Sequence, residues 1–305
     1  MRTYDLIIIG GGPAGLTAGV YARRGGLNVL IVENQAVGGQ MGRTLEIENY
    51  PGFATVNGFQ LAISMQEQCT TLGVEFVYGN IENLDLDGKD KKLTIDGEEY
   101  SSKAVIIATG TTPTYLNIKG EKEFAGRGVS YCAVCDGGFF KDKNVIVVGG
   151  GNTALEDAMY LQRFAKTVYL AHRRDEYRAS KILVDKLNES NVKQLKSSVI
   201  DEIVGDNKVT KVKVKNLKTN AISNIDMDGV FVAVGQTPTA SLFNVKKNER
   251  GYILVDQEMK TSIDGVFAAG DVTEKQIRQI VTACSDGAIA AESALKFLNF
   301  QQNSK

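Results

Sequence analysis

Residues 4–15 read YDLIIIGGGPAG, and this stretch decides how the chain begins to fold. The apolar, β-branched run at 4–9 leads straight into glycines, which predicts a short buried strand followed by a tight turn. Residues 16–24 have helical spacing, and the apolar run at 29–32 predicts a second strand that ends at Glu33. The order strand, G-x-G-x-x-G, helix, strand and acid is typical of a dinucleotide-binding unit.

Each residue of this motif has a physical task. Gly10 permits the turn, Gly12 lets the backbone approach a pyrophosphate, and Gly15 brings the helix close to the strand. Glu33 lies 23 residues after Gly10 and can accept hydrogen bonds from ribose hydroxyls, which favours an unphosphorylated ribose such as that of FAD. A structural glycine turn without a ligand is the alternative, and the flanking strands and acid favour the dinucleotide site.

The same pattern returns 139 residues later. Residues 144–148 predict a strand, residues 149–154 read GGGNTA, and a helix at 154–164 and a strand at 168–171 follow. An internal repeat of this kind predicts an α/β protein. We expect two Rossmann-like dinucleotide-binding domains of the three-layer ββα sandwich type, the second inserted in the first.

The second unit differs where the first has its acid. His172, the one histidine of the chain, lies 23 residues after Gly149, and Arg173, Arg174 and Arg178 follow it. An arginine cluster at a strand end suits a 2′-phosphate, which an acid would repel, so this unit is predicted to bind NADPH. A solvated basic helix start is the alternative. For His172, a polar residue at a strand end is favoured over a catalytic role.

Each unit closes with an apolar run that ends in glycine, at 105–110 and at 230–235. A further strand of this kind at 265–270 precedes a predicted helix at 276–298. Because the second unit is already closed, this last piece should return to the first domain. The predicted domains are an FAD-binding domain formed by 1–112 and 245–305, and an NADPH-binding domain at 113–244.

Composition and charge exclude several classes of protein. The 305 residues are enough for two domains, and 35 basic against 36 acidic residues lack the charge excess of a nucleic-acid binder. No apolar run reaches the ~18 residues that span a bilayer. Asp5 and the early glycines do not fit a signal peptide, and four cysteines make no secreted disulfide framework, so we expect a cytoplasmic protein.

Cys132-Ala133-Val134-Cys135-Asp136 precedes the second nucleotide strand. A zinc site would need two more ligands, and the other two cysteines and the histidine show no paired spacing, so no metal is expected. Two unrelated buried thiols are a second alternative. A redox-active disulfide is favoured, because C-x-x-C closes a small ring that exchanges readily. Asp136 is then a proton source for a leaving thiolate, or otherwise a helix cap.

Taken together and in order, the motifs resemble those of the low-molecular-weight, bacterial-type thioredoxin reductases over essentially the whole chain. The stretches that carry the resemblance are GGGPAG at 10–15, GGQ at 38–40, ENYPGF at 48–53, CAVCDG at 132–137, GGGNTA at 149–154, HRRDEYRA at 172–179, GVFAAGDV at 265–272 and RQIVTACSDG at 278–287.

The resemblance implies a set of site residues. For FAD it implies Gly10, Gly12, Pro13, Ala14, Gly15, Glu33, Gly39, Gln40, Asn49, Gly110, Asp271, Arg278, Gln279 and Ile280. For NADPH it implies Gly151, Asn152, Thr153, Arg173, Arg174 and Arg178. It makes Cys135 the sulfur nearer the flavin, Cys132 the sulfur that exchanges with substrate, and Asp136 the acid.

The activity that the resemblance implies is electron transfer from NADPH through FAD and the Cys132–Cys135 disulfide to oxidised thioredoxin, in a homodimer. It also implies rotation of the inserted domain, with hinges near 112–115 and 241–246. Two rivals remain. A ferredoxin-fed relative of the same fold would have degraded nucleotide motifs, which are intact here, and a non-catalytic thiol redox sensor would not need them. For Cys284, buried packing is favoured over a third redox thiol.

Overall fold

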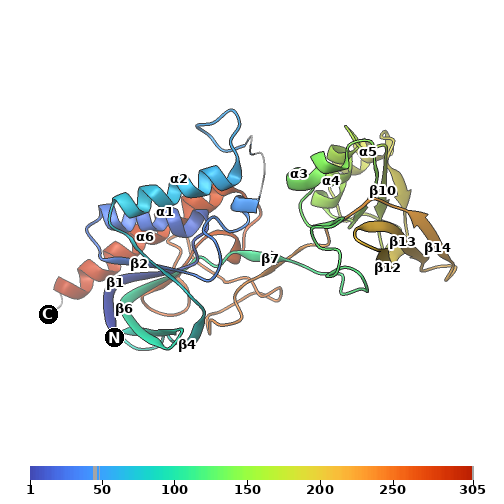
Figure 1. The fold of residues 1–305 in the computed structure, drawn as a ribbon. Coiled ribbons are helices and arrows are strands. Elements are labelled where there is room, and N and C mark those ends of the chain that lie inside the picture. The colour runs from blue at the N-terminus through green and yellow to red at the C-terminus, as the bar shows by residue number, and fades with distance from the viewer. Residues whose placement is uncertain (44–46, 48, 304–305) are drawn as a thin grey trace. The chain divides into compact units, whose positions relative to one another are not determined.

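The computed structural model describes residues 1–43, 47 and 49–303, except for the side chains of 43, 134–135 and 301–303. The chain folds as two compact units (Figure 1). Unit 1 comprises Met1–Thr112 and Thr237–Lys305, and unit 2 comprises Pro113–Gln236. The chain returns to unit 1 at Thr237 rather than at residue 245, because Ala240 and Phe243 are already buried in the core of unit 1.

Unit 1 is built on a mostly parallel sheet with the strand order β3-β2-β1-β6-β5-β4, in which β17 also pairs with β6. The strands are β1 Arg2–Ile9, β2 Val29–Glu33, β3 Glu75–Tyr78, β4 Ile81–Asp85, β5 Lys91–Ile95, β6 Glu98–Ile107 and β17 Val266–Ala268. The first strand is central, with Ile7 opposite both Leu30 and Val105. Strands buried on both faces explain why the early sequence is continuously apolar rather than alternating.

Helices α1 Pro13–Arg24, α2 Gly58–Thr71 and α6 Ile280–Asn303 lie together on one face of this sheet (Figure 1). Helix α1 begins with Pro13 and has Arg23 and Arg24 in its last turn. Proline is favoured at the first position of a helix, and positive charges stabilise the negative C-terminal end of the helix dipole. The predicted helix at 276–298 begins only at Ile280. Short 3-10 turns cover Met41–Arg43 (η1) and Gly270–Val272 (η3).

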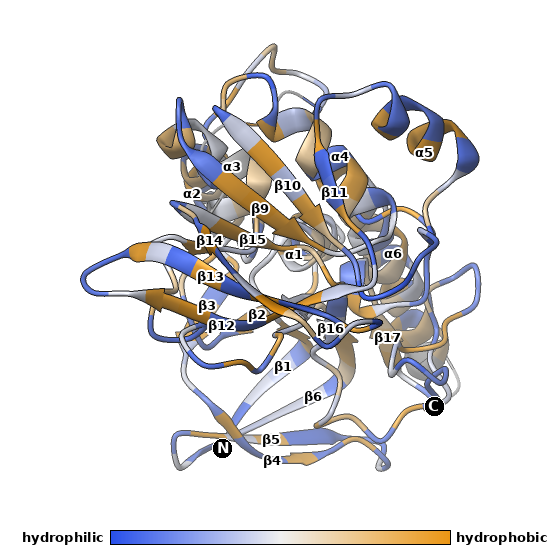
Figure 2. Ribbon diagram, turned by 90° about the vertical axis from the view of Figure 1, so that its right-hand side faces the viewer, coloured by the Kyte–Doolittle hydropathy of each residue, from blue (hydrophilic) through white to orange (hydrophobic). Residues whose placement is uncertain are grey.

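Unit 2 repeats this plan with a parallel sheet in the order β11-β10-β9-β15-β8. Its strands are β8 Val129–Ser130, β9 Asn144–Val148, β10 Thr167–Ala171, β11 Lys193–Leu195 and β15 Gly229–Val232. Figure 2 colours much of β9 and β10 as hydrophobic. The sheet is covered on one side by α3 Ala133–Asp136, η2 Gly137–Phe140, α4 Asn152–Leu161 and α5 Lys181–Asn188, and on the other by the antiparallel β12 Ser198–Gly205, β13 Val209–Asn216 and β14 Ile222–Asp226.

The predicted α/β class with two Rossmann-like units, one inserted in the other, is therefore confirmed. The two connections run as short strands, β7 Thr111–Pro113 and β16 Gln236–Pro238, which pair with each other. In the part of the chain that the structure describes, none of the helices is long and apolar enough to cross a membrane.

Candidate dinucleotide and disulfide sites

The glycine turn of unit 1 leaves the start of α1 open. Gly10 has φ +112°, and a Cβ there would lie 2.4 Å from the Ala108 carbonyl oxygen, so only glycine fits. At Gly15 a Cβ would lie 1.9 Å from the Gly10 oxygen, whereas at Gly12 no described atom comes within 4 Å. No described side chain caps α1. The backbone N–H groups at this helix start can therefore receive a phosphate.

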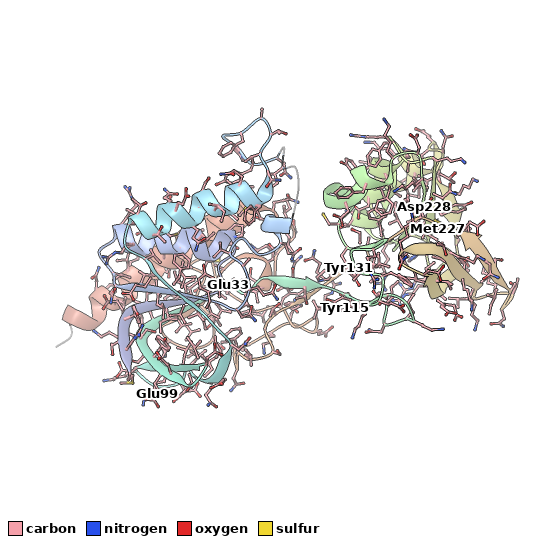
Figure 3. The ribbon with its side chains drawn as sticks, in the orientation of Figure 1. Glu33, Glu99, Tyr115, Tyr131, Met227 and Asp228 are labelled. Atoms are coloured by element: carbon pink, nitrogen blue, oxygen red, sulfur yellow. The ribbon has the colours of Figure 1, made fainter. Side chains whose placement is uncertain are left out.

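Glu33 lies at the end of β2 beside this turn (Figure 3). Its Oε2 accepts a hydrogen bond from the Gly11 N–H at 2.7 Å, and its Oε1 accepts from the N–H groups of Asn34 and Gln35 at 2.8 and 2.9 Å. These bonds fix the carboxylate next to the glycines. The acid and the glycine turn thus meet as the spacing in the sequence predicted.

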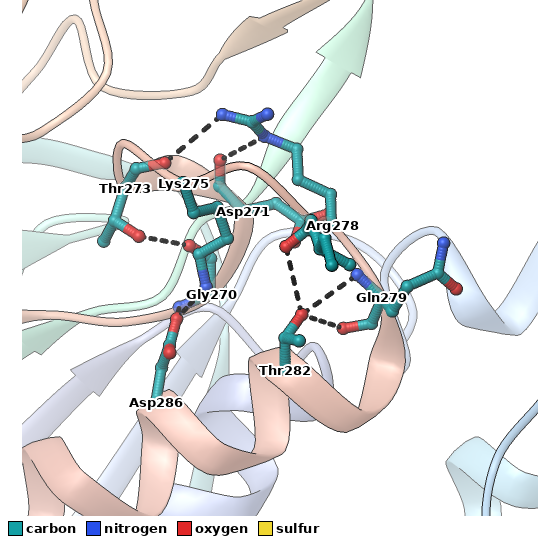
Figure 4. A network of polar contacts seen from close by, with 9 residues as sticks. Gly270, Asp271, Thr273, Lys275, Arg278, Gln279, Thr282 and Asp286 are labelled. Atoms are coloured by element: carbon teal, nitrogen blue, oxygen red, sulfur yellow. Dashed lines mark hydrogen bonds and ion pairs between the residues drawn. The ribbon is translucent and has the colours of Figure 1, made fainter. Parts of the chain in front are cut away.

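Asp271 lies in η3, close to the start of α6 (Figure 4). Its Oδ1 is buried and has no hydrogen-bond partner among the described residues. Burial raises the pKa of this carboxyl, while the positive charges of Lys275 and Arg278 oppose the rise. Arg278 donates to the carbonyls of Asp271 and Thr273 at 3.5 and 3.4 Å, and its guanidinium lies 4.1 Å from the centre of the Tyr252 ring.

A largely buried ion pair joins this turn to α6. Asp286 Oδ2 accepts both the Gly270 N–H, at 2.9 Å, and the Lys275 ammonium group (Figure 4). The two charged side chains are only 13% and 14% exposed. The next residue of α6, Gly287, lies against Ala14, where a Cβ would come within 2.1 Å of the Ala14 oxygen. Lys275 and Asp286, to which the sequence motifs assigned no role, thus hold η3 against α6.

The other predicted FAD residues of unit 1 come from separate loops. Gln40 donates through Nε2 to the Thr111 oxygen and Oγ1 at 2.9 and 2.7 Å, and Thr111 follows Gly110 directly. Asn49 donates to Gln279 Oε1 at 2.9 Å. Gly39 and Gly110 have positive φ, +54° and +64°, and Ile280 is the first residue of α6. The structure therefore brings Asn49 to Gln279, and Gln40 to the residue after Gly110.

The glycine turn of unit 2 has the same construction. A Cβ at Gly149 would lie 2.3 Å from the Ala233 oxygen, whereas at Gly151 no described atom comes within 4 Å. No described side chain caps α4, which begins at Asn152. The Asn152 side chain accepts from the Ser180 N–H at 2.8 Å. The start of α4 is thus a second open phosphate position.

The arginine loop is tied to this turn by its backbone. Arg178 donates its N–H to the Gly150 oxygen at 2.7 Å. Buried His172 packs under Gly150, stacks on Tyr177 and donates its Nε2–H to the Glu176 oxygen at 3.0 Å. Burial lowers the pKa of His172, and the charges of Arg173, Arg174 and Arg178 lower it further. The three arginine side chains are exposed around this buried histidine.

Cys132 is disulfide-bonded, whereas Cys69 and Cys284 are free. The backbone of Cys135 lies in α3, and its side chain is outside the described side chains. Cys69 is fully buried and donates to the Leu16 oxygen at 3.1 Å, and burial raises its pKa to about 12. Cys284 is half-buried, with its sulfur 3.9 Å from both the Pro13 oxygen and the Tyr50 hydroxyl.

The residues around Cys132 include two that the sequence analysis missed. Ser130 donates to Asp136 Oδ2 at 2.6 Å and accepts from the Cys132 N–H at 3.1 Å. Glu121, buried at 1% exposure, accepts from the Tyr131 hydroxyl at 3.2 Å, and Tyr131 meets Tyr115 edge-on (Figure 3). A serine two residues before a cysteine is too common to single out in a sequence, and Glu121 matches no motif.

Comparison with known proteins decides the family. The family model described as pyridine nucleotide-disulphide oxidoreductase matches residues 4–287. The chain belongs to this family. Two features of this oxidoreductase fit the family's description: the glycine turns at Gly12 and Gly151, which have open space beside them, and the disulfide-bonded Cys132.

The similarity to known proteins extends over nearly the whole chain of this oxidoreductase. A thioredoxin reductase of Listeria innocua is 45% identical over 302 residues, which are 97% of this chain and 94% of the relative. A thioredoxin reductase of Bacillus subtilis is 45% identical over 97% of this chain and 95% of its own length. The crystal structure of Lactococcus lactis thioredoxin reductase in its FR conformation matches with a TM-score of 0.82 and 43% identity, covering 97% of this chain and 99% of that one.

Proposed function

We propose that this oxidoreductase is an NADPH-dependent thioredoxin reductase, which passes electrons through FAD and a Cys132–Cys135 disulfide to oxidised thioredoxin. The observation that carries the proposal is a disulfide-bonded Cys132 in the same compact unit as a nucleotide turn with an arginine cluster. The relatives named thioredoxin reductase, at 45% identity over nearly the full length, support the same activity.

Unit 1 fits FAD. The uncapped start of α1, the open space at Gly12 and the fixed Glu33 carboxylate suit the pyrophosphate and ribose of an ADP group. The buried, unpartnered Oδ1 of Asp271 suits a hydroxyl donor on the ligand. When bound, FAD supplies an acceptor for hydride and a donor of two electrons. Gly10, Gly12, Pro13, Ala14, Gly15, Glu33, Gly39, Gln40, Asn49, Gly110, Asp271, Arg278, Gln279 and Ile280 are the proposed contacts.

Unit 2 fits NADPH. The open space at Gly151 and the uncapped start of α4 suit the pyrophosphate, and the exposed guanidinium groups suit the 2′-phosphate. The proposed contacts are Gly151, Asn152, Thr153, Arg173, Arg174 and Arg178. The intact turn and arginines favour NADPH over ferredoxin as the electron source, and a thiol sensor without turnover would need neither.

Three residues carry the proposed disulfide chemistry. Cys132 exchanges with the thioredoxin disulfide, Cys135 faces the flavin, and Asp136 gives a proton to the thiolate that is released. We assign FAD binding to unit 1, NADPH binding to unit 2, a homodimeric state and a cytoplasmic location. The resemblance to bacterial-type thioredoxin reductases supports the dimer, and two free cysteines support a reducing compartment.

An anaerobic NADPH titration of the purified yellow protein, followed at the flavin absorption band, tests this proposal. Flavin and disulfide each accept one hydride equivalent, so about two NADPH per chain should be consumed before free NADPH accumulates. Consumption of one equivalent would remove the disulfide from the mechanism. No bleaching of the flavin would instead exclude NADPH as the electron donor.

A further inference from the structure

The Ser130 hydroxyl bridges the two ends of the disulfide turn. Its oxygen accepts the Cys132 N–H at 3.1 Å and lies 2.6 Å from Asp136 Oδ2. It also lies 3.2 Å from the Cys132 carbonyl oxygen, which accepts the Asp136 N–H at 3.1 Å as α3 begins. One hydroxyl thus contacts the backbone of the proposed exchanging cysteine and the carboxylate of the proposed acid.

Ser130 is buried in the sheet of unit 2. It ends β8, where it lies opposite Phe231 of β15 at the edge of the parallel sheet, and it is only 5% exposed. Its single hydrogen has two acceptors, the Asp136 carboxylate and the Cys132 carbonyl. The carboxylate contact is shorter and charge-assisted, so the hydrogen points there when Asp136 is ionised.

A hydroxyl both donates and accepts, and it can therefore serve both states of the acid. When Asp136 is protonated, its O–H can donate to Ser130 Oγ, and the hydroxyl hydrogen can turn to the Cys132 carbonyl. Neither state then leaves a half-buried polar group unpaired. An alanine at this position would lose the bond in both states.

We propose that Ser130 is a positioning residue for disulfide exchange, which keeps Asp136 aimed at the disulfide turn in both protonation states. This inference rests on the proposed function. Reduction of the disulfide breaks the S–S bond and takes two electrons and two protons, of which the hydride equivalent from NADPH supplies both electrons and one proton. Asp136 gives its proton to the thiolate released and becomes the carboxylate that Ser130 holds. When the dithiol reduces thioredoxin, Asp136 takes back the proton of the attacking thiol, and water gives one proton to the thiolate released on thioredoxin.

The test compares thioredoxin reduction by the holoenzyme and by Ser130→Ala, Ser130→Thr, Asp136→Ala and the double variant Ser130→Ala/Asp136→Ala. Ser190→Ala is the matched control. Like Ser130, Ser190 accepts a hydrogen bond from the backbone N–H two residues further along, that of Val192, at 3.3 Å. Unlike Ser130, it donates to a backbone carbonyl and not to a carboxylate. Ser130→Ala should lower kcat about tenfold and leave KM for thioredoxin unchanged. This loss is smaller than the full contribution of general acid catalysis, because Asp136 itself is still present. Ser130→Thr should recover most of kcat, and Ser190→Ala should match the wild type.

The double variant separates positioning from folding. If Ser130 acts through Asp136, Ser130→Ala should change kcat less than about twofold in the Asp136→Ala background. A full tenfold loss in that background, or a wild-type kcat in Ser130→Ala, would overturn the inference. Wild-type enzyme that consumed one NADPH per chain, or failed to turn over thioredoxin, would overturn the proposed function and the inference with it.

Discussion

Asp271 retains a buried carboxylate oxygen without a hydrogen bond from any described residue. A buried polar group that loses its hydrogen bond to water on folding and gains no other lowers the free energy of unfolding by about 1–3 kcal/mol. The neighbouring charges of Lys275 and Arg278 compensate only in part, since the pKa of Asp271 is still raised. A residue of this kind destabilises the apoprotein, and a ligand hydroxyl would relieve the cost.

Asp271→Asn should therefore stabilise the apoprotein at neutral pH by about 1 kcal/mol and weaken FAD binding. The folded pKa is raised, so the contribution of Asp271 to stability is present below its ordinary pKa of 3.8 and is lost as pH rises through the raised value. The extra stability of the variant over the wild type should therefore increase as pH rises from 3.8 through the raised pKa. Urea unfolding of both apoproteins between pH 4 and pH 8 measures it, and a less stable variant at pH 7 would contradict the argument.

The arginine cluster makes a second prediction at the scale of single residues. Arg174→Gln should raise KM for NADPH about 10- to 100-fold and leave KM for NADH nearly unchanged, because a bond to a charged phosphate contributes roughly 1.5–3 kcal/mol. Arg163→Gln is the control, since Arg163 is an exposed arginine of the same unit whose guanidinium lies over the Tyr160 ring. Equal effects of the two variants would mean that only net charge matters.

At the scale of elements, adjacent glycines in one turn have different tasks. A Cβ at Gly150 would lie 2.2 Å from ring atoms of buried His172, whereas a Cβ at Gly151 meets no described atom within 4 Å. The first position is therefore constrained by packing, and the second is left open for a ligand.

Gly150→Ala should destabilise the protein by about 2 kcal/mol, as overpacking does. Gly151→Ala should leave the stability within about 0.5 kcal/mol and raise KM for NADPH at least tenfold, because the methyl group occupies the path of the pyrophosphate. Thermal unfolding and steady-state kinetics of the pair check this. If both variants lost stability alike, the space at Gly151 would not be a ligand position.

The ion pair between η3 and α6 also acts at this scale. Lys275→Met leaves Asp286 largely buried without its cation and should cost about 3 kcal/mol of unfolding free energy. Lys218→Met removes an exposed pair with Asp175, whose side chains are 65% and 56% exposed, and should leave the free energy of unfolding nearly unchanged. Urea unfolding of the apoproteins compares them, and a cost below 1 kcal/mol for Lys275→Met would show that the pair is solvated.

At the scale of the whole molecule, unit 2 is an insertion with separate hydrophobic cores on the two faces of its sheet. Its two ends meet, because Thr114 donates its N–H to the Gly235 oxygen at 3.0 Å. A fragment of residues 113–236 should therefore fold alone and unfold cooperatively in urea. Val147→Asp, in the buried β9, should abolish this transition. A fragment that unfolds without cooperativity would show that unit 2 depends on unit 1.

Local spacing in the sequence was enough to predict the two nucleotide units. Strand, glycine turn and helix follow one another within about 30 residues, and their periodicity and φ requirements are local. Glu33 lies beside Gly11 and Arg178 beside Gly150 for the same reason, since a turn and the next strand end must meet at one edge of the sheet. The start of α6 and the return at Thr237 were predicted less well, because helix starts and domain boundaries depend on packing.

The sequence by itself therefore determined the fold class, the glycine turns and the arginine cluster, because each depends on residues that are close together in the chain. Only the tertiary structure decided which distant side chains meet. Asn49 reaches Gln279 from 230 residues away, and Lys275 and Asp286 meet beside Gly270. It also decided that Ser130, rather than any of the other serines, holds Asp136. Such contacts depend on how helices and turns pack on the sheet, and no local pattern in the sequence records that packing.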